Sequence, residues 1–326
     1  MVFDIKNLEC KYKTGANAVL LVDDLQIKKG EVVFFLGASG VGKSTILETL
    51  GLMNNTIHAN PTTKFNFHSN KTVENMINIW EHKESYLAEF RKEHLSFIFQ
   101  STNLFPNLNA EDNVLLTPML QGTPEFEAKN NVRPIFKKIF TKEYKEILGD
   151  RGVQKTNLFG KKYCKVYKGK KISEMSGGQR QRLAFVRAIA TNYNILFADE
   201  PTGNLDWANA NNLMTHLIED IKKKGATSVI VSHDISLAIQ HADKIVYIDK
   251  VEKTIKNNNP CKLDGEKDEM DYHHGLINDA NTYVRQLGGG WSNQVSYDNM
   301  KAPVIDDANL IEYFKEKIIK QNTENA

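Results

Sequence analysis

The chain has 326 residues, of which 41% are hydrophobic and 25% are charged, and its formal net charge is +2. This composition is ordinary for a globular protein of one large or two modest domains. The near balance of charges argues against nucleic acid as the main partner, because binding to a phosphate backbone usually needs a strong basic excess.

The N-terminus alternates charged and apolar residues, so it lacks the continuous apolar core of a signal peptide. No run of about 18 apolar residues occurs, and the sequence therefore predicts no membrane-spanning helix. The three cysteines, Cys10, Cys164 and Cys261, are odd in number and far apart. They indicate free thiols in a reducing compartment rather than structural zinc or a disulfide framework.

Residues 2–36 predict β-structure, and the run from Val32 to Gly37 is apolar throughout, as expected of a strand covered on both faces. The sequence GASGVGKST follows this strand and precedes a helix-like run. It fits the phosphate-binding pattern G-x-x-x-x-G-K-[ST], called the P-loop below. Its residues are Gly37, Ala38, Ser39, Gly40, Val41, Gly42, Lys43, Ser44 and Thr45.

This pattern assigns separate roles to the P-loop residues. The glycines let backbone N–H groups surround the β-phosphate, Lys43 reaches the β- and γ-phosphates, and the Ser44 hydroxyl can bind Mg²⁺. Upstream of the loop, Tyr12 is a candidate for stacking on adenine. These features predict a nucleotide site.

The middle of the chain, residues 101–175, shows no strong strand pattern and predicts a subdomain of helices and loops. Segment 161–171 holds six lysines. A solvated loop is the simpler interpretation of this segment, and contact with anionic lipid or an acidic partner is the alternative.

A second candidate anion site follows at residues 173–182, SEMSGGQRQR. A hydroxyl and two glycines at the start of a helix, predicted from Gln179 to Ala190, are suited to an anion. The residues concerned are Ser176, Gly177, Gly178 and Gln179.

Two further segments, residues 194–200 and 227–234, repeat the apolar strand pattern, and residues 207–224 between them predict a helix. Strands that alternate with helices indicate a parallel α/β sheet, whose ligands bind at the carboxyl ends of the strands. The chemistry-bearing residues fall at such ends: Gln100, Asp199, Glu200 and His233.

Asp199 and Glu200 are adjacent in a strand, so their side chains face opposite ways and should have different roles. We expect Asp199 to hold Mg²⁺ and Glu200 to polarise the attacking water as general base. His233 is expected to contact the γ-phosphate or this water, and Gln100 to join the Mg²⁺ shell.

Residues 251–326 differ in composition from the rest of the chain. They contain 9 Lys and Arg against 13 Asp and Glu, a net charge of −4, so residues 1–250 carry +6. A polar linker and a glycine cluster precede a predicted amphipathic helix in which Ile311, Phe314 and Ile318 share one face. This helix packs on its own domain in one interpretation, and is a regulatory or docking element in the other.

The order of these motifs resembles that of the ATP-binding cassette (ABC) ATPases over roughly residues 2–250. The resemblance includes the P-loop, Gln100 as the Q-loop, residues 175–179 as the signature, residues 195–200 as the Walker B strand, residues 204–206 as the D-loop, and His233 as the switch histidine. Residues 97–114 and 199–206 are similar to ATPases of the lipoprotein-releasing, macrolide-export and cell-division type.

The resemblance implies an α/β fold, a P-loop NTPase of ABC type with a mostly parallel sheet core, an antiparallel β N-terminal part and an α-helical subdomain at about 101–190. Residues 1–250 would form the cassette and residues 251–326 a C-terminal extension. Lys43, Glu200 and His233 would be catalytic, and ATP and Mg²⁺ would be bound.

In this family two cassettes meet head to tail, and each ATP lies between one chain's P-loop and the other chain's signature. Ser176, Gly177, Gly178 and Gln179 would thus serve the partner's nucleotide, and Asp206 would contribute from the D-loop. The implied partners are separate integral membrane permease-type subunits and a second cassette, identical or different. The implied location is cytoplasmic, on the inner face of the cell membrane.

The sequence departs from the family pattern in three places. Met175 stands where the family usually has Leu, the segments 54–95 and 100–176 are long, and the extension has no counterpart in a minimal cassette. A soluble ABC-type ATPase acting on DNA or ribosomes is the alternative function. A non-hydrolysing scaffold would usually lack the general base, and a GTPase would carry an N-K-x-D motif, which is absent from the sequence.

Overall fold

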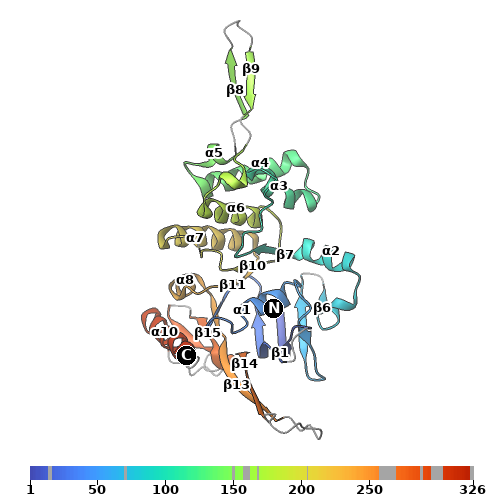
Figure 1. The fold of residues 1–326 in the computed structure, drawn as a ribbon, viewed down its shortest axis with the longest axis vertical. Coiled ribbons are helices and arrows are strands. Elements are labelled where there is room, and N and C mark those ends of the chain that lie inside the picture. Colours follow the sequence, from blue (N-terminus) through green and yellow to red (C-terminus); the bar gives the residue numbers. More distant parts are fainter. Residues whose placement is uncertain are drawn as a thin grey trace, which may run out of the picture. The chain divides into compact units, whose positions relative to one another are not determined.

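The structure is a computed structural model (Figure 1). It describes residues 1–13, 17–69, 72–148, 151–156, 162–166, 169–203, 205–256, 269–286, 289–294 and 304–323. Internal contacts divide the chain into two compact units, one of Met1–Ala88 with Thr227–Ala326 and the other of Glu89–Ala226. The predicted boundary between a cassette and an extension at residue 250 stays a proposal.

The first unit contains a mainly antiparallel sheet built on the N-terminal strands. In spatial order its strands are β13 (Asp249–Lys256), β14 (Glu269–Ile277), β2 (Leu20–Ile27), β1 (Phe3–Cys10), β5 (Lys64–His68) and β6 (Val73–Asn75), and β4 (Ile57–His58) pairs with β1. Phe3 of β1 packs against Phe65 and Phe67 of β5, at centroid distances of 6.1 and 5.6 Å. The β-structure predicted for residues 2–36 is present.

The same unit contains a second, mixed set of strands, with two parallel and two antiparallel neighbouring pairs. In spatial order these are β16 (Trp291–Asn293), β15 (Thr282–Arg285), β12 (Lys244–Tyr247), β3 (Val32–Leu36) and β11 (Thr227–Val231). β3 pairs in parallel with both β11 and β12, and every residue of these three strands is buried. Such strands read as continuous apolar runs because both of their faces are covered.

Among the residues of this unit that the structure describes, three α-helices lie wholly within it: α1 (Lys43–Leu50), α8 (Ile235–His241) and α10 (Asp307–Thr323). Short 3₁₀ turns lie at η1 (Ile79–Glu81) and η3 (Asp279–Asn281). Among the described residues, no helix combines the length and the apolar character that a membrane crossing requires. Cys10 is a free, buried thiol, and burial raises its pKa to about 12.

The C-terminal extension is more structured than the sequence predicts. A linker, a glycine cluster and one helix were expected, whereas β13, β14, β15 and β16 join the strands of the first unit. These strands escape prediction because they are short or mixed in polarity and form by pairing with distant segments, as β14 does with β2. Part of the predicted linker, residues 257–268, lies outside the described residues.

The terminal helix α10 packs against its own unit through Leu310 and Phe314, which are both fully buried. The predicted apolar face of Ile311, Phe314 and Ile318 is thus partly wrong, because Ile311 and Ile318 are only partly buried. The spacing of four residues between Leu310 and Phe314 places both on one face of the helix. The Phe314 ring stacks on Tyr247 at 5.5 Å and meets Tyr283 edge-on at 5.2 Å.

Replacing Phe314 with Ala is expected to lower the free energy of unfolding by about 3–5 kcal/mol, because it removes a large buried ring and leaves a cavity. The control is Ile319→Ala on the same helix, where the parental side chain is 62% exposed. Urea unfolding followed by circular dichroism measures both variants. Equal stability of the two would contradict the packing described for α10.

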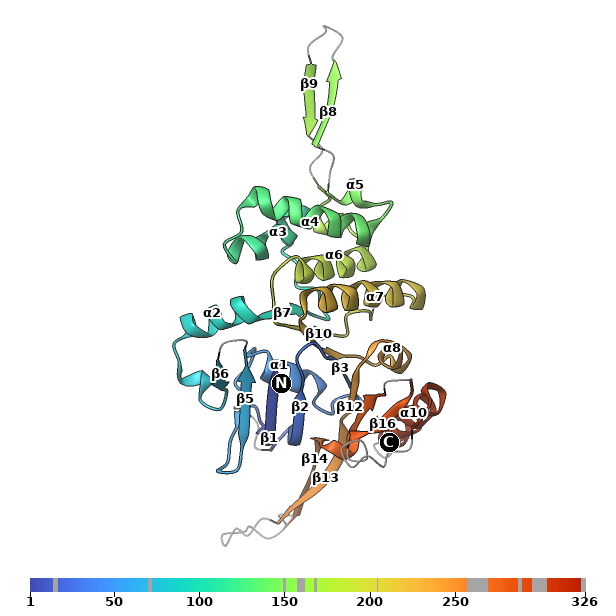
Figure 2. The same ribbon diagram turned by 180° about the vertical axis from the view of Figure 1, so that it is seen from behind.

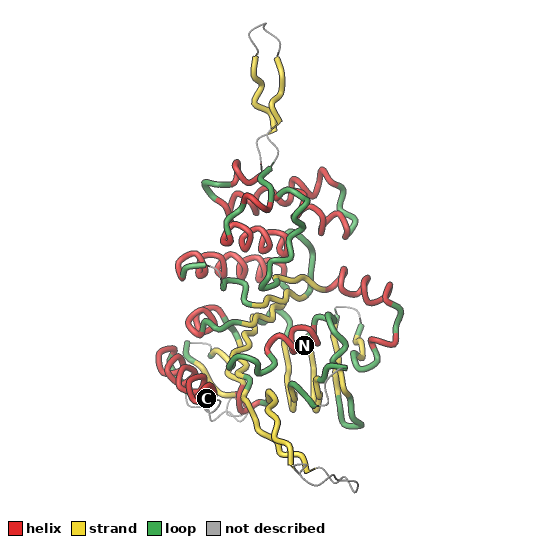
Figure 3. Tube along the Cα trace, in the orientation of Figure 1, coloured by secondary structure: helices red, strands yellow, loops and turns green. Residues whose placement is uncertain are grey.

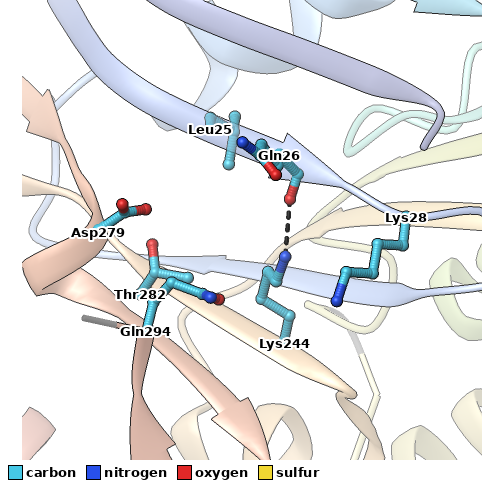
Figure 4. A pocket seen from close by; sticks show the side chains of 7 residues that line it. All are labelled: Leu25, Gln26, Lys28, Lys244, Asp279, Thr282 and Gln294. Atoms are coloured by element: carbon cyan, nitrogen blue, oxygen red, sulfur yellow. Dashed lines mark hydrogen bonds between the residues drawn. The ribbon is translucent and has the colours of Figure 1, made fainter. Parts of the chain in front are cut away.

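The extension also closes over a buried lysine of the parallel strands (Figure 4). Lys244 is 3% exposed, and its ammonium donates to the Gln26 carbonyl at 2.7 Å and lies 3.4 Å from the Glu31 carboxylate. Burial lowers the pKa of Lys244. A polar pocket of about 100 Å³ surrounds this lysine, and it is also lined by Leu25, Lys28, Asp279, Thr282 and Gln294. Extension residues therefore form one wall of a pocket whose other wall is β2.

The second unit is mainly helical, with a pair of parallel strands (Figure 2). Helix α2 (Glu84–His94) leads into it from the first unit. Its elements are β7 (Leu95–Ile98), α3 (Ala110–Leu120), α4 (Glu125–Phe140), α5 (Tyr144–Leu148), β8 (Arg151–Thr156), β9 (Lys162–Val166), η2 (Ile172–Glu174), α6 (Gly177–Ile189), β10 (Ile195–Asp199) and α7 (Trp207–Lys224). Helices α3, α4 and α6 pack on one another and bury Val114, Phe136 and Phe185.

The expectation of helices and loops alone for residues 101–175 is wrong. β8 and β9 form an antiparallel hairpin, visible as two strands beyond the helices in Figure 3. Lysine is unfavourable in strands, so a segment this rich in lysine shows no strand pattern in its sequence. The lysine-rich segment 161–171 thus includes a strand, and its contact with lipid or an acidic partner stays untested.

Candidate functional site

The P-loop joins the buried strand β3 to helix α1 in the first unit. Gly37, Gly40 and Gly42 have φ angles of +153°, +75° and +99°, which L side chains rarely adopt. A side-chain carbon at Gly37 would lie 2.9 Å from both the Ile248 carbonyl oxygen and Val41 Cγ1. The loop is therefore a tight backbone turn that glycine makes possible.

Lys43 turns back across the loop, with its side chain buried. Its ammonium donates to the carbonyl oxygens of Gly37 at 2.9 Å and Ala38 at 2.6 Å. Ser39 and Ser44 are exposed, whereas Val41 and Thr45 are buried. Gly42 is the N-cap of α1 and supplies no capping side chain. An exposed hydroxyl, a cation and a helix N-terminus thus lie together, which suits a phosphate group.

Tyr12 contacts the helix that follows the P-loop. Its hydroxyl donates to Glu48 Oε2 at 2.7 Å and lies 3.3 Å from Thr45 Oγ1. Burial, reinforced by Glu48, raises the pKa of Tyr12 to about 12. The hydroxyl is thus held by α1, and stacking of the ring on adenine stays a prediction.

His233 emerges at the same edge of the parallel strands as the P-loop. Val231 of β11 lies opposite Phe35 of β3. His233 comes two residues after Val231 and Gly37 two residues after Phe35, so both lie just beyond the carboxyl ends of paired strands. His233 is exposed, and the Asp234 side chain caps α8 by accepting from the Leu237 N–H at 3.0 Å. The strand register therefore brings His233 and the P-loop to the same edge within one unit.

Gln100 and Glu200 meet within the second unit. β7 and β10 are parallel, with Ile98 opposite Ala198, and Gln100 Nε2 donates to Glu200 Oε2 at 3.1 Å. Glu200 has φ +45°, an uncommon conformation for a residue other than glycine. Asp199 ends β10 and, like Glu200, is partly exposed. Backbone strain of this kind is typical of functional sites.

Ser176 and Gly177 are exposed at the start of α6. The Ser176 hydroxyl accepts from the Gln179 N–H at 3.2 Å, and the Gln179 side chain accepts from the Ser176 N–H at 3.1 Å. This capping box holds the first turn. The buried Gln179 also donates to Glu143 at 3.2 Å, so its side chain binds within the chain, and its contact with nucleotide stays a prediction.

Asp206 is exposed and caps α7. Its carboxylate accepts from the Asn209 N–H at 3.0 Å and the Asn209 amide at 2.6 Å. The backbone hydrogen bond from Asn209 is the main cause that lowers the pKa of Asp206. A structural role is thus evident for this residue, and its contact with nucleotide stays a prediction. Asn204 of the predicted D-loop lies outside the described residues.

Two side chains of α6 that the sequence did not single out support these loops. The Arg187 guanidinium donates to the carbonyls of Asn103 at 2.6 Å and Thr102 at 2.8 Å, three and two residues after Gln100. Gln181 is fully buried and donates to the Pro201 carbonyl at 2.7 Å, directly after Glu200. Helix α6 thus begins within residues 175–179, and its side chains hold the segments that follow Gln100 and Glu200.

Comparison with known proteins identifies the family. The family model described as "ABC transporter" matches residues 22–203. The chain belongs to the ABC transporter family. A bacitracin export ATP-binding protein, BceA of Halalkalibacterium halodurans, is 31% identical over 76% of this chain and 85% of its own length.

Other relatives have the same character. The lipoprotein-releasing system ATP-binding protein LolD of Aquifex aeolicus is 36% identical over 66% of this chain and 80% of its own length. The macrolide export ATP-binding/permease protein MacB of Shewanella oneidensis is 30% identical over 73% of this chain but only 31% of its own length.

A solved dimeric ATP-binding cassette in a post-hydrolysis state, bound to ADP and Pi, is also similar. Its TM-score is 0.56 at 27% identity, over 75% of this chain and 93% of that one. The predicted family, fold class and activity are confirmed: this ABC protein is an α/β P-loop NTPase that binds and hydrolyses ATP. The comparisons do not support the soluble alternative.

Proposed function

We propose that this ABC ATPase is the motor subunit of an export or mechanically driven membrane complex, bound to separate permease-type chains at the inner face of the cell membrane. The observation that carries the proposal is its similarity to ATP-binding proteins of bacitracin, lipoprotein and macrolide export systems over about three quarters of its length. The dimeric state of the similar solved cassette supports a pair of cassettes.

The residues of the P-loop fit a nucleoside triphosphate. Lys43 and the N-terminus of α1 would neutralise its phosphates, and the turn at Gly37 brings the backbone close to them. Mg²⁺ prefers oxygen ligands, and we propose the Ser44 hydroxyl, the Asp199 carboxylate and the Gln100 amide oxygen for it. The bound ion would neutralise charge on the phosphates.

The catalytic roles are proposed from the sequence motifs, and the positions of the polar groups support them. Glu200 would accept a proton from the attacking water, and the hydrogen bond from Gln100 keeps its carboxylate oriented. His233 would contact the γ-phosphate or this water. Ser176 with the N–H groups of Gly177 and Gly178 would bind the γ-phosphate held by the partner cassette, at the positive end of α6.

Purification of a tagged chain from detergent-solubilised membranes tests the proposal. A multi-spanning membrane protein is expected in a fixed ratio to the chain, in a complex whose ATPase activity is lost in Glu200→Gln. The variant is the control, because it should still recover the partner. Full ATPase activity in the membrane-free fraction, with no membrane protein in fixed ratio, would favour a soluble ATPase instead.

A further inference from the structure

The C-terminal extension reaches the P-loop at Gly275. This residue lies on β14, opposite Leu20 of β2, and its N–H donates to the Val19 carbonyl at 2.9 Å. A side-chain carbon at Gly275 would lie 2.8 Å from both Ile248 Cγ2 and Leu20 Cδ1, and it would overlap the carbonyl oxygen of Val41. Glycine permits this close approach of two backbones. The extension thus packs directly on the middle of the P-loop.

A second contact joins the extension to the helix that follows His233. Arg285, at the end of β15, donates from Nε to the Ala242 carbonyl at 3.1 Å and from Nη2 to the Ile239 carbonyl. These carbonyls lie at the C-terminal end of α8, where backbone oxygens lack partners within the helix and a cation is favourable. α8 begins at Ile235, two residues after His233, so a shift of this short helix would also move the backbone of His233.

Arg285 is itself held in place by the rest of the extension. Its guanidinium lies 4.4 Å from the centre of the fully buried Trp291 ring. Asp307, the first residue of α10, accepts from Trp291 Nε1 at 2.9 Å and lies 3.8 Å from Arg285 Nη1. A cation over an aromatic face and beside a carboxylate has a defined position. The contact with α8 is therefore part of a connected structure.

We propose that the extension positions the nucleotide site of its own chain, with Gly275 supporting the P-loop and Arg285 fixing α8 and thereby His233. The proposal rests on the nucleotide roles proposed above for the P-loop and His233. Its two contacts should act on different steps. A displaced P-loop weakens nucleotide binding, whereas a displaced His233 slows turnover of bound ATP.

The test uses the full-length chain with Gly275→Ala and Arg285→Gln. Gly275→Ala is expected to raise the Kd for ATP about tenfold while kcat at saturation stays within about twofold, because the added methyl displaces Val41. The control is Gly289→Ala, also in the extension, where an added carbon meets no atom within 4 Å. It is expected to keep the parental Kd and kcat, although the added side chain is strained at a φ of +96° and lowers the stability.

Arg285→Gln is expected to lower kcat about fivefold with little change in Kd, and Arg285→Lys to lower it less, because one ammonium can still reach a carbonyl. Hydrogen exchange should increase at residues 235–242 in Arg285→Gln and at residues 37–42 in Gly275→Ala. If Gly275→Ala does not fold, the Arg285 variants decide the question by themselves.

A purely structural extension would give a different result. The melting temperatures would fall, but folded Gly275→Ala would keep the parental Kd and Arg285→Gln the parental kcat, and this outcome would overturn the proposal. Failure of the proposed nucleotide roles would be recognised separately, since Lys43→Ala would then keep the parental Kd for ATP and His233→Ala the parental kcat.

Discussion

Replacing Glu200 with Gln is expected to lower the ATPase rate by about 10²–10⁴-fold, the usual contribution of a general base, while ATP binding persists. An amide does not accept a proton from water, yet it has nearly the same shape and still accepts the hydrogen bond from Gln100 Nε2. ATP should therefore bind without being consumed, and the closed dimer should accumulate. Steady-state hydrolysis and size-exclusion chromatography with ATP measure the two effects.

Glu89→Gln is the matched control for this substitution, because Glu89 is an exposed carboxylate of the same unit that forms an ion pair with Lys92. Loss of a surface ion pair has little effect on activity or stability. The control should hydrolyse ATP at the parental rate. A parental rate in Glu200→Gln itself would show that another group accepts the proton.

Mixing Lys43→Ala with Ser176→Arg is expected to restore activity that neither variant has alone. Lys43→Ala removes the cation from the P-loop, and Ser176→Arg places a bulky side chain at the start of α6. In a head-to-tail heterodimer, the intact P-loop of one chain meets the intact signature of the other. Random pairing and independent sites would give about a quarter of the parental activity.

Ser176→Arg also removes the N-cap of α6, which costs about 1 kcal/mol, so its folding needs to be verified. Ser85→Arg on the exposed side of α2 is the control for the added arginine and should remain active. The mixture is assayed after dimers have been verified by size-exclusion chromatography with ATP. Absence of recovery in verified mixed dimers would count against a composite site.

The sequence by itself determined the elements whose pattern is local. The helix predicted for residues 207–224 is α7 with the same bounds, and its apolar residues Leu213, Leu217 and Ile221 are all buried. The strand, glycine loop and helix around Lys43 were equally predictable. A periodic run specifies which face is buried, and a glycine specifies where the backbone must turn, whatever lies elsewhere in the chain.

The positions of the candidate site residues at the ends of strands and the starts of helices were predictable for the same reason, because each lies within a short motif. Their partners were not. Arg187 is separated from the Thr102 carbonyl by 85 residues, and Arg285 from the Ile239 carbonyl by 46. A long cationic side chain can reach many carbonyls, and the folded chain alone decides which ones lie within its range.

The tertiary structure also decided the strands of the extension and the hairpin of β8 and β9. β14 forms beside β2, more than 250 residues earlier in the chain, and the overlap that demands glycine at position 275 arises only from that pairing. Strand formation depends on the hydrogen bonds and side chains of the partner strand, so a short or lysine-rich strand carries little signal of its own. The sequence therefore revealed the chemistry of the site, and long-range pairing determined what holds it in place.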